Sequence, residues 1–361
     1  MESLFTHFQL GAYELPNRFV MSSPTRLRSP EGQADDNTAD YYSQRAGAGL
    51  IITEGLPVSA QGNGFIFTPG IYTSPQVASW IPVTEAVHAS KGKIIAQLVH
   101  VGRVSHTSLQ PEGGLPVSSV AEQGGCAFSI NASGEPGLVK ASKPRALTTP
   151  EIKQIVSDFK DAARNAMSAG FDSVEIQAAG GYLIEQFLNP VLNVRTDKYG
   201  ALSIADRSRL LLEITDAVST EIGSENTGIR LAPCNQSQGM ALYPDIAETY
   251  THIVREINNR TLSYVHLSVN GPVMFDGLFR KIRQICQRPL IVSGGLTVTQ
   301  GECLISDNLA DLVGFSSPFV SNPDFVERIR NGWPLAPVCR TQHYGGGKEG
   351  YTDYPCYCEH N

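Results

Sequence analysis

Residues 148–178 read TTPEIKQIVSDFKDAARNAMSAGFDSVEIQA and contain one complete helix–strand unit. The opening Thr-Thr-Pro-Glu is typical of a capped helix start with proline in the first turn. Apolar residues then recur at three- and four-residue spacing, which predicts an amphipathic helix over 152–169. Gly170 ends this pattern, and the short apolar run 173–178 predicts a buried strand.

The same kind of unit recurs along the whole chain. Short, mostly apolar runs predict eight strands, at 19–23, 50–54, 93–100, 173–178, 228–233, 264–269, 289–293 and 312–315. Helical patterns lie between or beside them at 38–46, 75–90, 152–169, 182–188, 207–222, 246–258 and 323–330. Strict alternation favours parallel strands with right-handed crossovers. We therefore expect a single (β/α)8 TIM barrel domain over 1–361. An open doubly wound sheet is the competing architecture, but no Gly-x-Gly-x-x-Gly follows the first strand.

Composition narrows the class of protein. A chain of 361 residues with 41% hydrophobic and 17% charged side chains fits one large α/β domain. The net charge of −7, without runs of lysine or arginine, argues against a nucleic-acid partner. No stretch approaches the roughly 18 apolar residues of a membrane span, and residues 1–10 lack an apolar signal core, so we expect a cytoplasmic protein without a membrane partner. The oligomeric state is left open.

The cysteines give no sign of a disulfide framework or a metal site. Their number, seven, is odd, and only Cys356 and Cys358 lie close together. No second pair of cysteine or histidine residues stands at metal-ligand spacing. We expect reduced thiols and no metal.

The segment 101–146 interrupts the strand–helix alternation. It is rich in glycine, serine and proline and has little helical pattern, so we expect it to form a cap over the barrel mouth. Chemistry in such barrels lies where the strands end. That rule selects Thr25, Gln97, Gln177, Arg230, Gly294 and Ser316.

Several of these positions have both a functional and a structural interpretation. Gln97 and Arg230 each interrupt an apolar strand, and a buried guanidinium must find an anion or hydrogen-bond acceptors. For Arg230 this is either a ligand or an internal salt bridge to Glu54 or Glu175. Gly294-Gly295 suits a phosphate or a simple turn. Tyr182 is either a proton donor or a structural tyrosine.

Longer sequence motifs are more specific than these single residues. Through them the chain resembles the old yellow enzyme family over nearly its whole length. They occur in the family's order: Tyr41-Tyr-Ser-Gln-Arg-Ala46, Leu50-Ile-Ile-Thr-Glu-Gly55, Gln97-Leu-Val-His-Val-Gly-Arg103, Gly170-Phe-Asp-Ser-Val-Glu-Ile176, Gly181-Tyr-Leu-Ile-Glu-Gln-Phe-Leu188, Asn193-Val-Arg-Thr-Asp-Lys-Tyr-Gly200 and Gly350-Tyr-Thr-Asp-Tyr-Pro355.

The resemblance implies an FMN-dependent, ene-reductase-like oxidoreductase that takes hydride from NADPH and delivers it to the conjugated C=C of a small molecule. It implies that Thr25 bonds flavin O4, Gln97 holds the pyrimidine edge and Arg230 stabilises charge near N1. Tyr182 would protonate the alkene carbon alpha to the carbonyl. The remaining cofactor positions would be Ser23, Pro24, Gly55, Gly294, Gly295, Ser316 and Ser317, and substrate would meet Gln177, Gly180, Tyr182 and Tyr344.

The chain departs from the family in its substrate grip. The family reads Glu-Ile-His-Gly-Ala-Asn-Gly-Tyr-Leu where this chain reads Glu175-Ile-Gln-Ala-Ala-Gly-Gly-Tyr-Leu183. The His/Asn pair that holds the substrate carbonyl is thus Gln177 and Gly180. Loss of one such donor typically removes about 2.7–4 kcal/mol of transition-state stabilisation. We therefore expect impaired reduction of ordinary enones and room for a bulkier substrate.

Two further departures concern the cofactor. The family's Gly-Arg on the last strand is Ser316-Ser317, which replaces a charged phosphate contact of about 1.5–3 kcal/mol with a hydroxyl. FMN affinity would fall by about one or two decades. The usual Ala-Pro-Leu-Thr-Arg is Ser22-Ser-Pro-Thr-Arg26, so the proline is displaced by one position. That displacement would shift the backbone beneath the flavin.

Three functions follow from these observations. The first is an FMN oxidoreductase of a specialised biosynthetic pathway, which reduces, desaturates or isomerises an unusual conjugated substrate. The second is a redox-silent isomerase or cyclase in which Tyr182 acts as acid or base; Gly180 and Ser317 motivate it. The third is a non-catalytic binding protein, against which Arg230 and Tyr182 argue. A yellow chromophore that NADPH bleaches distinguishes the first from the others.

Overall fold

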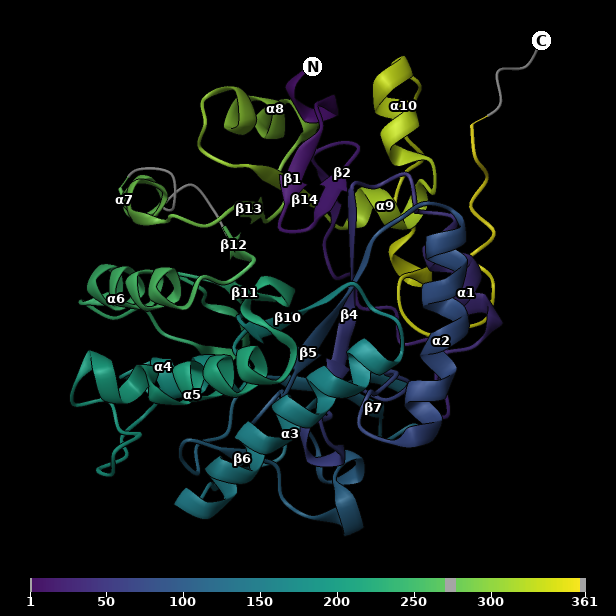
Figure 1. Cartoon of the computed structure of the whole chain (residues 1–361). Coiled ribbons are helices and arrows are strands. Elements are labelled where there is room, and N and C mark those ends of the chain that lie inside the picture. Colours follow the sequence, from purple (N-terminus) through teal and green to yellow (C-terminus); the bar gives the residue numbers. More distant parts are fainter. Residues whose placement is uncertain (1, 270–276, 358–361) are drawn as a thin grey trace.

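The computed structural model describes residues 2–269 and 277–357. Eight parallel strands close into a barrel with helices around the outside (Figure 1). Around the barrel the strands follow chain order, and β5 pairs with β10 across the segment that separates them. The strands are β3 (Phe19–Met21), β4 (Leu50–Pro57), β5 (Ile94–Val99), β10 (Ser173–Ala178), β11 (Thr227–Leu231), β12 (Tyr264–Ser268), β13 (Leu290–Ser293) and β14 (Leu312–Phe315). The predicted (β/α)8 barrel is confirmed, and the open sheet is wrong.

All the predicted helices are present, with ends shifted by a few residues. They are α1 (Asp36–Ser43), α2 (Ser74–Ala89), α3 (Thr149–Ser168), α4 (Leu183–Leu188), α5 (Ile204–Ile222), α6 (Ile246–Arg260) and α10 (Phe325–Asn331). The capping box between Thr148 and Glu151 at the start of α3 is formed, and Gly170 beyond its end has a φ of +86°. Three further helices were not predicted: α7 (Leu278–Ile285), α8 (Val298–Ser306) and α9 (Ser317–Ser321). Of these, α8 begins with a capping box formed by Thr297 and Gln300, which is a sequence pattern typical of a helix start.

The barrel interior is apolar at the end where the strands begin and polar where they finish. Side chains alternate along a strand, so residues two apart share the interior. Near the strand starts the interior holds an apolar cluster of Leu10, Leu15, Val20, Leu50, Ile52, Ile95, Tyr264, Ile291 and Leu312. Leu10 and Leu15 come from the hairpin of β1 (Phe8–Leu10) and β2 (Tyr13–Leu15). Closer to the carboxyl ends of β5, β11 and β12, the inward-facing residues include Gln97, Arg230 and His266.

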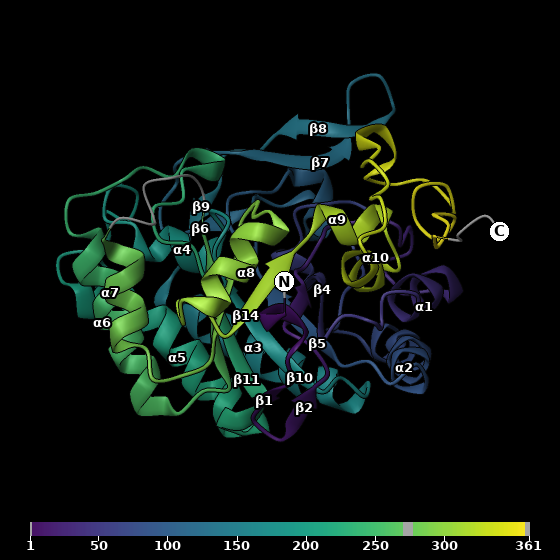
Figure 2. The ribbon, with the colours of Figure 1, turned by 90° about the horizontal axis from the view of Figure 1, so that it is seen from above.

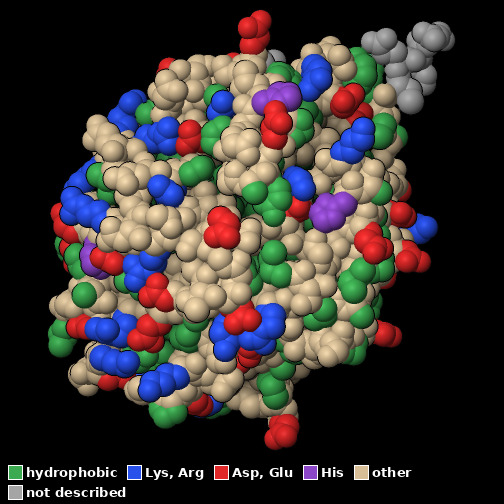
Figure 3. Space-filling model, in the orientation of Figure 1, with side chains coloured by type: hydrophobic (Ala, Val, Ile, Leu, Met, Phe, Trp, Pro, Cys, Tyr) green, Lys and Arg blue, Asp and Glu red, His purple; other side chains and the backbone are tan. Residues whose placement is uncertain are grey.

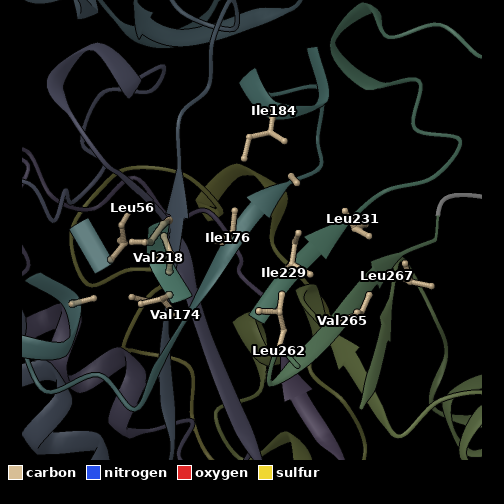
Figure 4. Packing of buried hydrophobic residues seen from close by; sticks show 14 of the residues in the cluster. Leu56, Val174, Ile176, Ile184, Val218, Ile229, Leu231, Leu262, Val265 and Leu267 are labelled. Atoms are coloured by element: carbon tan, nitrogen blue, oxygen red, sulfur yellow. The ribbon is translucent and has the colours of Figure 1, made fainter. Parts of the chain in front are cut away.

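The outer face of the strands holds the main core. Val174 and Ile176 of β10 belong to the same buried cluster as Ile229 and Leu231 of β11 and Val218 of α5 (Figure 4). Full burial of each such aliphatic side chain contributes about 1.5–3 kcal/mol. This packing between strands and helices fixes the strand positions and thereby the positions of the inward-facing polar residues.

The segment after β5 forms two small sheets in place of a single helix. β6 (Val117–Ser118) pairs with β9 (Arg145–Ala146), and β7 (Cys126–Ile130) pairs antiparallel with β8 (Pro136–Lys140). Seen from above, the β7–β8 hairpin lies at one edge of the molecule, beyond the barrel strands (Figure 2). Backbone hydrogen bonds attach β7 to the loop after β4: Phe128 donates to Gly64 O at 3.2 Å, and Ile66 donates to Phe128 O at 2.8 Å.

Acidic and basic side chains are interspersed over the face shown in Figure 3. Among residues 2–269 and 277–357, no helix has the length and apolarity to cross a membrane, and no cluster of three or more His, Cys, Asp or Glu is placed to hold a metal ion. Cys358 lies outside the described residues.

Candidate functional site

A two-part cleft lies at the carboxyl ends of the barrel strands. Its first part is a cavity of about 260 Å³ and its second part is a cavity of about 550 Å³; Ser23, Arg230 and Ser268 line both. Volumes of this order are typical of cofactor and small-molecule sites. The structure gathers the predicted positions here. Ser23, Thr25, Gly55, Gln97, Gln177, Gly180, Tyr182 and Arg230 line the first part, and Gly294, Gly295, Ser316 and Ser317 line the second.

Arg230 stands where the two parts of the cleft meet. Its Nη1 donates to Ser23 Oγ at 2.6 Å, and its buried Nε has no hydrogen-bond partner among the described residues. The salt bridge to Glu54 or Glu175 is not formed: Glu175 instead bonds His266, and Glu54 accepts from the backbone N–H of Arg26 at 3.1 Å. Burial lowers the pKa of Arg230, but a guanidinium keeps its charge in proteins. The site therefore presents an incompletely partnered cation.

Ser23 adopts an unusual backbone conformation beside this arginine. Its φ is +24°, inside the left-handed range that side chains rarely adopt. It directly precedes Pro24, the proline that is displaced relative to the family pattern. Pro24 itself is buried and does not line the cleft.

A buried hydrogen-bond chain crosses the floor of the cleft. Glu175 Oε1 accepts from Gln97 Nε2 at 2.7 Å, and Gln97 Oε1 accepts from Gln177 Nε2 at 3.2 Å. Glu175 Oε2 also accepts from the hydroxyl of Tyr264 at 3.1 Å and bonds Nδ1 of His266 at 2.8 Å. Burial opposes ionisation of Glu175, but His266, Arg230 and Gln97 together hold its pKa below the usual value. Gln97 is thus fixed in place by its neighbours on either side.

Tyr182 lies directly before α4, with its ring on the cavity wall. Its ring meets that of Phe65 edge-on, with the centroids 6.3 Å apart. Desolvation raises the pKa of Tyr182 to about 12, partly offset by the charge of Arg230. The phenol therefore carries its proton at neutral pH and is available as an acid.

Two glycines with positive φ set the position of Tyr182. Gly180 has a φ of +74°, and a Cβ added there would lie 3.1 Å from Tyr182 Cε2. Gly181 has a φ of +78°, and its N–H donates to Glu185 Oε2 at 2.6 Å. The same carboxylate oxygen accepts from Asn235 Nδ2 at 3.0 Å, and burial raises the pKa of Glu185 to about 8.

The second part of the cleft has the character of a phosphate cradle with little charge. Gly294 has a φ of +129°, and a Cβ there would lie 1.8 Å from Val269 O, so only glycine fits. Hydroxyls of serine dominate the lining, and Arg230 is the single Lys or Arg among the described lining residues. The segment 270–276, which reads NGPVMFD, contains no Lys or Arg either.

Two residues that were not predicted line the cleft, whereas the predicted Tyr344 does not. Tyr344 is 51% exposed and is not among the residues that line the cleft; its ring lies 6.1 Å from that of Phe128 in β7. Sequence analysis missed Asn235 and Ser268, which line the first part. Both lie at or just beyond the end of a barrel strand, so the strand-end rule itself would have found them.

Fold and cleft together define a (β/α)8-barrel enzyme whose site combines an incompletely partnered guanidinium, a fixed carboxamide and a tyrosine acid. Comparison with known proteins agrees. The model of the NADH:flavin oxidoreductase / NADH oxidase family matches residues 3–336. The chain belongs to this family, the old yellow enzyme family, and is an FMN-dependent oxidoreductase of the ene-reductase kind.

Individual relatives resemble the chain over nearly its whole length. It is 38% identical to 12-oxophytodienoate reductase 1 of Oryza sativa subsp. japonica, over 98% of this chain and 92% of that protein. It is 37% identical to a chanoclavine-I aldehyde reductase of Penicillium roqueforti, over 98% and 96%. The structure of morphinone reductase in complex with tetrahydroNAD superposes with a TM-score of 0.94 at 42% identity, covering 98% of each chain. These relatives act on different small molecules, as their names state.

The residues of the cleft fit FMN. Arg230, which lines the first cavity, has a buried Nε without a hydrogen-bond partner among the described residues and could donate to the edge of a flavin ring. In the second cavity, Gly295 has open space where a Cβ would stand, so a phosphate could approach its backbone. The match is poor at the position expected to bind the phosphate of FMN, because Ser317 stands there in place of the family's arginine.

Proposed function

We propose that this protein transfers hydride to the conjugated C=C of a specialised small molecule, with NADPH as the hydride source and Tyr182 as the proton donor. The observation that carries this proposal is the common cavity of Tyr182 and Arg230, one a protonated acid and the other an incompletely partnered cation.

Each residue has a distinct task in this proposal. Bound FMN would supply hydride chemistry between the reduced nicotinamide and the substrate. Arg230, Gln97 and Thr25 would hold the redox ring in the first part of the cleft. Tyr182 delivers a proton to the alkene carbon alpha to the activating group. Ser23, Gly55 and the second part of the cleft would hold the remainder of the cofactor.

We further propose that the segment 101–146 caps the cleft. Phe128 of the β7–β8 hairpin hydrogen-bonds the chain at Gly64 and Ile66, and Gly64 and Phe65 line the first cavity. The hairpin therefore supports the wall against which Tyr182 packs. Tyr344 contacts the same hairpin at the rim, where it would meet only the outer part of a substrate.

The test is the colour of the purified protein. We expect FMN to co-purify and its visible absorbance to bleach on anaerobic addition of NADPH, with NADH as the parallel arm that settles coenzyme preference. A colourless protein that no added FMN turns yellow would refute the proposal.

One alternative has an observation in its favour. Gly180 offers no donor and Gln177 Nε2 uses one of its two N–H groups on Gln97, so the usual polarisation of a carbonyl is weakened. A redox-silent isomerase or cyclase, in which Tyr182 shuttles a proton, needs less polarisation of a substrate carbonyl. Substrate turnover by the flavin-free protein would establish this alternative.

A further inference from the structure

Gln177 lines the first cavity and holds a buried acceptor atom that has no hydrogen-bond partner among the described residues. Its side chain is only 7% exposed, and the acceptor atom is Oε1. A buried polar atom of this kind is destabilising unless a ligand satisfies it.

The orientation of this amide follows from its neighbours. An ionised carboxylate only accepts hydrogen bonds, so Glu175 requires that Gln97 point its Nε2 toward it. Gln97 then turns its Oε1 toward Gln177, and Gln177 must donate from its own Nε2. Gln177 Oε1 is left without a hydrogen-bond partner among the described residues. Reversing the Gln177 amide would place two carbonyl oxygens against each other.

Two neighbouring positions, Gly180 and Asn235, do not offset this arrangement. Gly180 has no side chain, and Asn235 uses its Nδ2 on Glu185 and its Oδ1 on the N–H of Ser237. A substrate carbonyl placed against Gln177 Oε1 would therefore set acceptor against acceptor, and only the second N–H of Gln177 Nε2 could donate to that carbonyl.

We propose that Gln177 selects conjugated substrates whose activating group carries an N–H or O–H donor, such as a protonated conjugated imine, in preference to a bare enone. This inference rests on the proposed function, because it concerns the substrate of that site. An iminium N–H would satisfy Gln177 Oε1, and its positive charge would withdraw electrons from the C=C without any donor from the protein. The departure at Gln177 and Gly180 then becomes a change of specificity rather than a loss of activity.

Three bicyclic ligands of similar size test the proposal on the FMN-loaded protein by calorimetry. Indole carries an N–H donor, benzofuran replaces it with an ether oxygen, and 1-indanone carries a carbonyl acceptor. We expect indole to bind about tenfold more tightly than either of the others. Gln177→Leu should abolish the preference, and Gln177→His, which restores a donor, should shift it toward 1-indanone.

Equal binding of the three ligands, or a preference for 1-indanone in the unaltered protein, would overturn the inference. Bleaching by NADPH, measured on the same samples, reports the proposed function separately. Failure of bleaching would refute the hydride chemistry, whereas the ligand preference reports only on Gln177.

Discussion

The ring of Tyr182 lies against Gly180, so closely that a Cβ added at Gly180 would stand 3.1 Å from Tyr182 Cε2. The glycine that removes the family's second substrate donor is therefore also the residue that makes room for the acid. A side chain at this position must displace the ring or strain the backbone.

Gly180→Ala is expected to lower both stability and turnover. Its φ of +74° costs about 1–3 kcal/mol for a residue with a Cβ, and the contact with Tyr182 adds to this. Gly332→Ala is the matched control, since Gly332 has a φ of +69° and nothing within 4 Å of an added Cβ. Urea unfolding and steady-state rates measure both variants. Equal rates and equal stability losses in the two would show that the ring contact is unimportant.

Tyr182→Phe is expected to separate the two half-reactions. Removal of a positioned proton donor slows its step by about 10²–10⁴-fold, while reduction of the flavin by NADPH should be nearly unchanged. Stopped-flow absorbance follows each half-reaction alone. Because the pKa of Tyr182 is raised to about 12, the substrate half-reaction of the unaltered protein should not lose rate up to about pH 10 through this group. Equal slowing of both half-reactions would contradict the role.

Ser317→Arg should tighten FMN binding by about 10–100-fold, through a charge-assisted bond to phosphate. Riboflavin, which lacks the phosphate, is the control ligand and should bind both proteins equally. Fluorescence titration of the apoprotein at low and high salt measures the effect, which should shrink as salt rises. If riboflavin gained as much as FMN, the second part of the cleft would not be the phosphate site.

Glu185→Gln should change how stability depends on pH. Burial raises the folded-state pKa of Glu185 to about 8, above the unfolded value. The folded protein therefore binds more protons than the unfolded chain between about pH 4.5 and 8, and this carboxyl destabilises it increasingly as pH rises through that window. The Gln variant should gain stability relative to the original toward pH 8 and show little difference near pH 4. Parallel stability curves would show that Glu185 titrates normally.

The barrel could be predicted because local signals agree along the chain. Capping residues, helical periodicity and β-branched runs each point to the same alternation, and the strand-end rule then selects Gln97, Arg230 and Gln177. The helices α7 and α8 were missed although the shorter α4 and α10 were predicted, so helix length does not explain the difference, and the capping box of α8 was overlooked.

The contacts within the site were beyond such reasoning. Gln97 meets Gln177 across 80 positions of sequence, and Arg230 meets Ser23 across 207. These pairs form only when the barrel closes, and the interior offered Arg230 other partners, such as Glu175. Tyr344 was assigned from the family resemblance alone, which does not say on which side of the cap its ring lies.

A crystal structure of the yellow protein with FMN tests the central claim most directly. We expect the isoalloxazine ring in the first part of the cleft, with its pyrimidine edge against the side chains of Gln97 and Arg230. An Arg230 guanidinium paired with Glu175, with the flavin elsewhere or absent, would contradict the account.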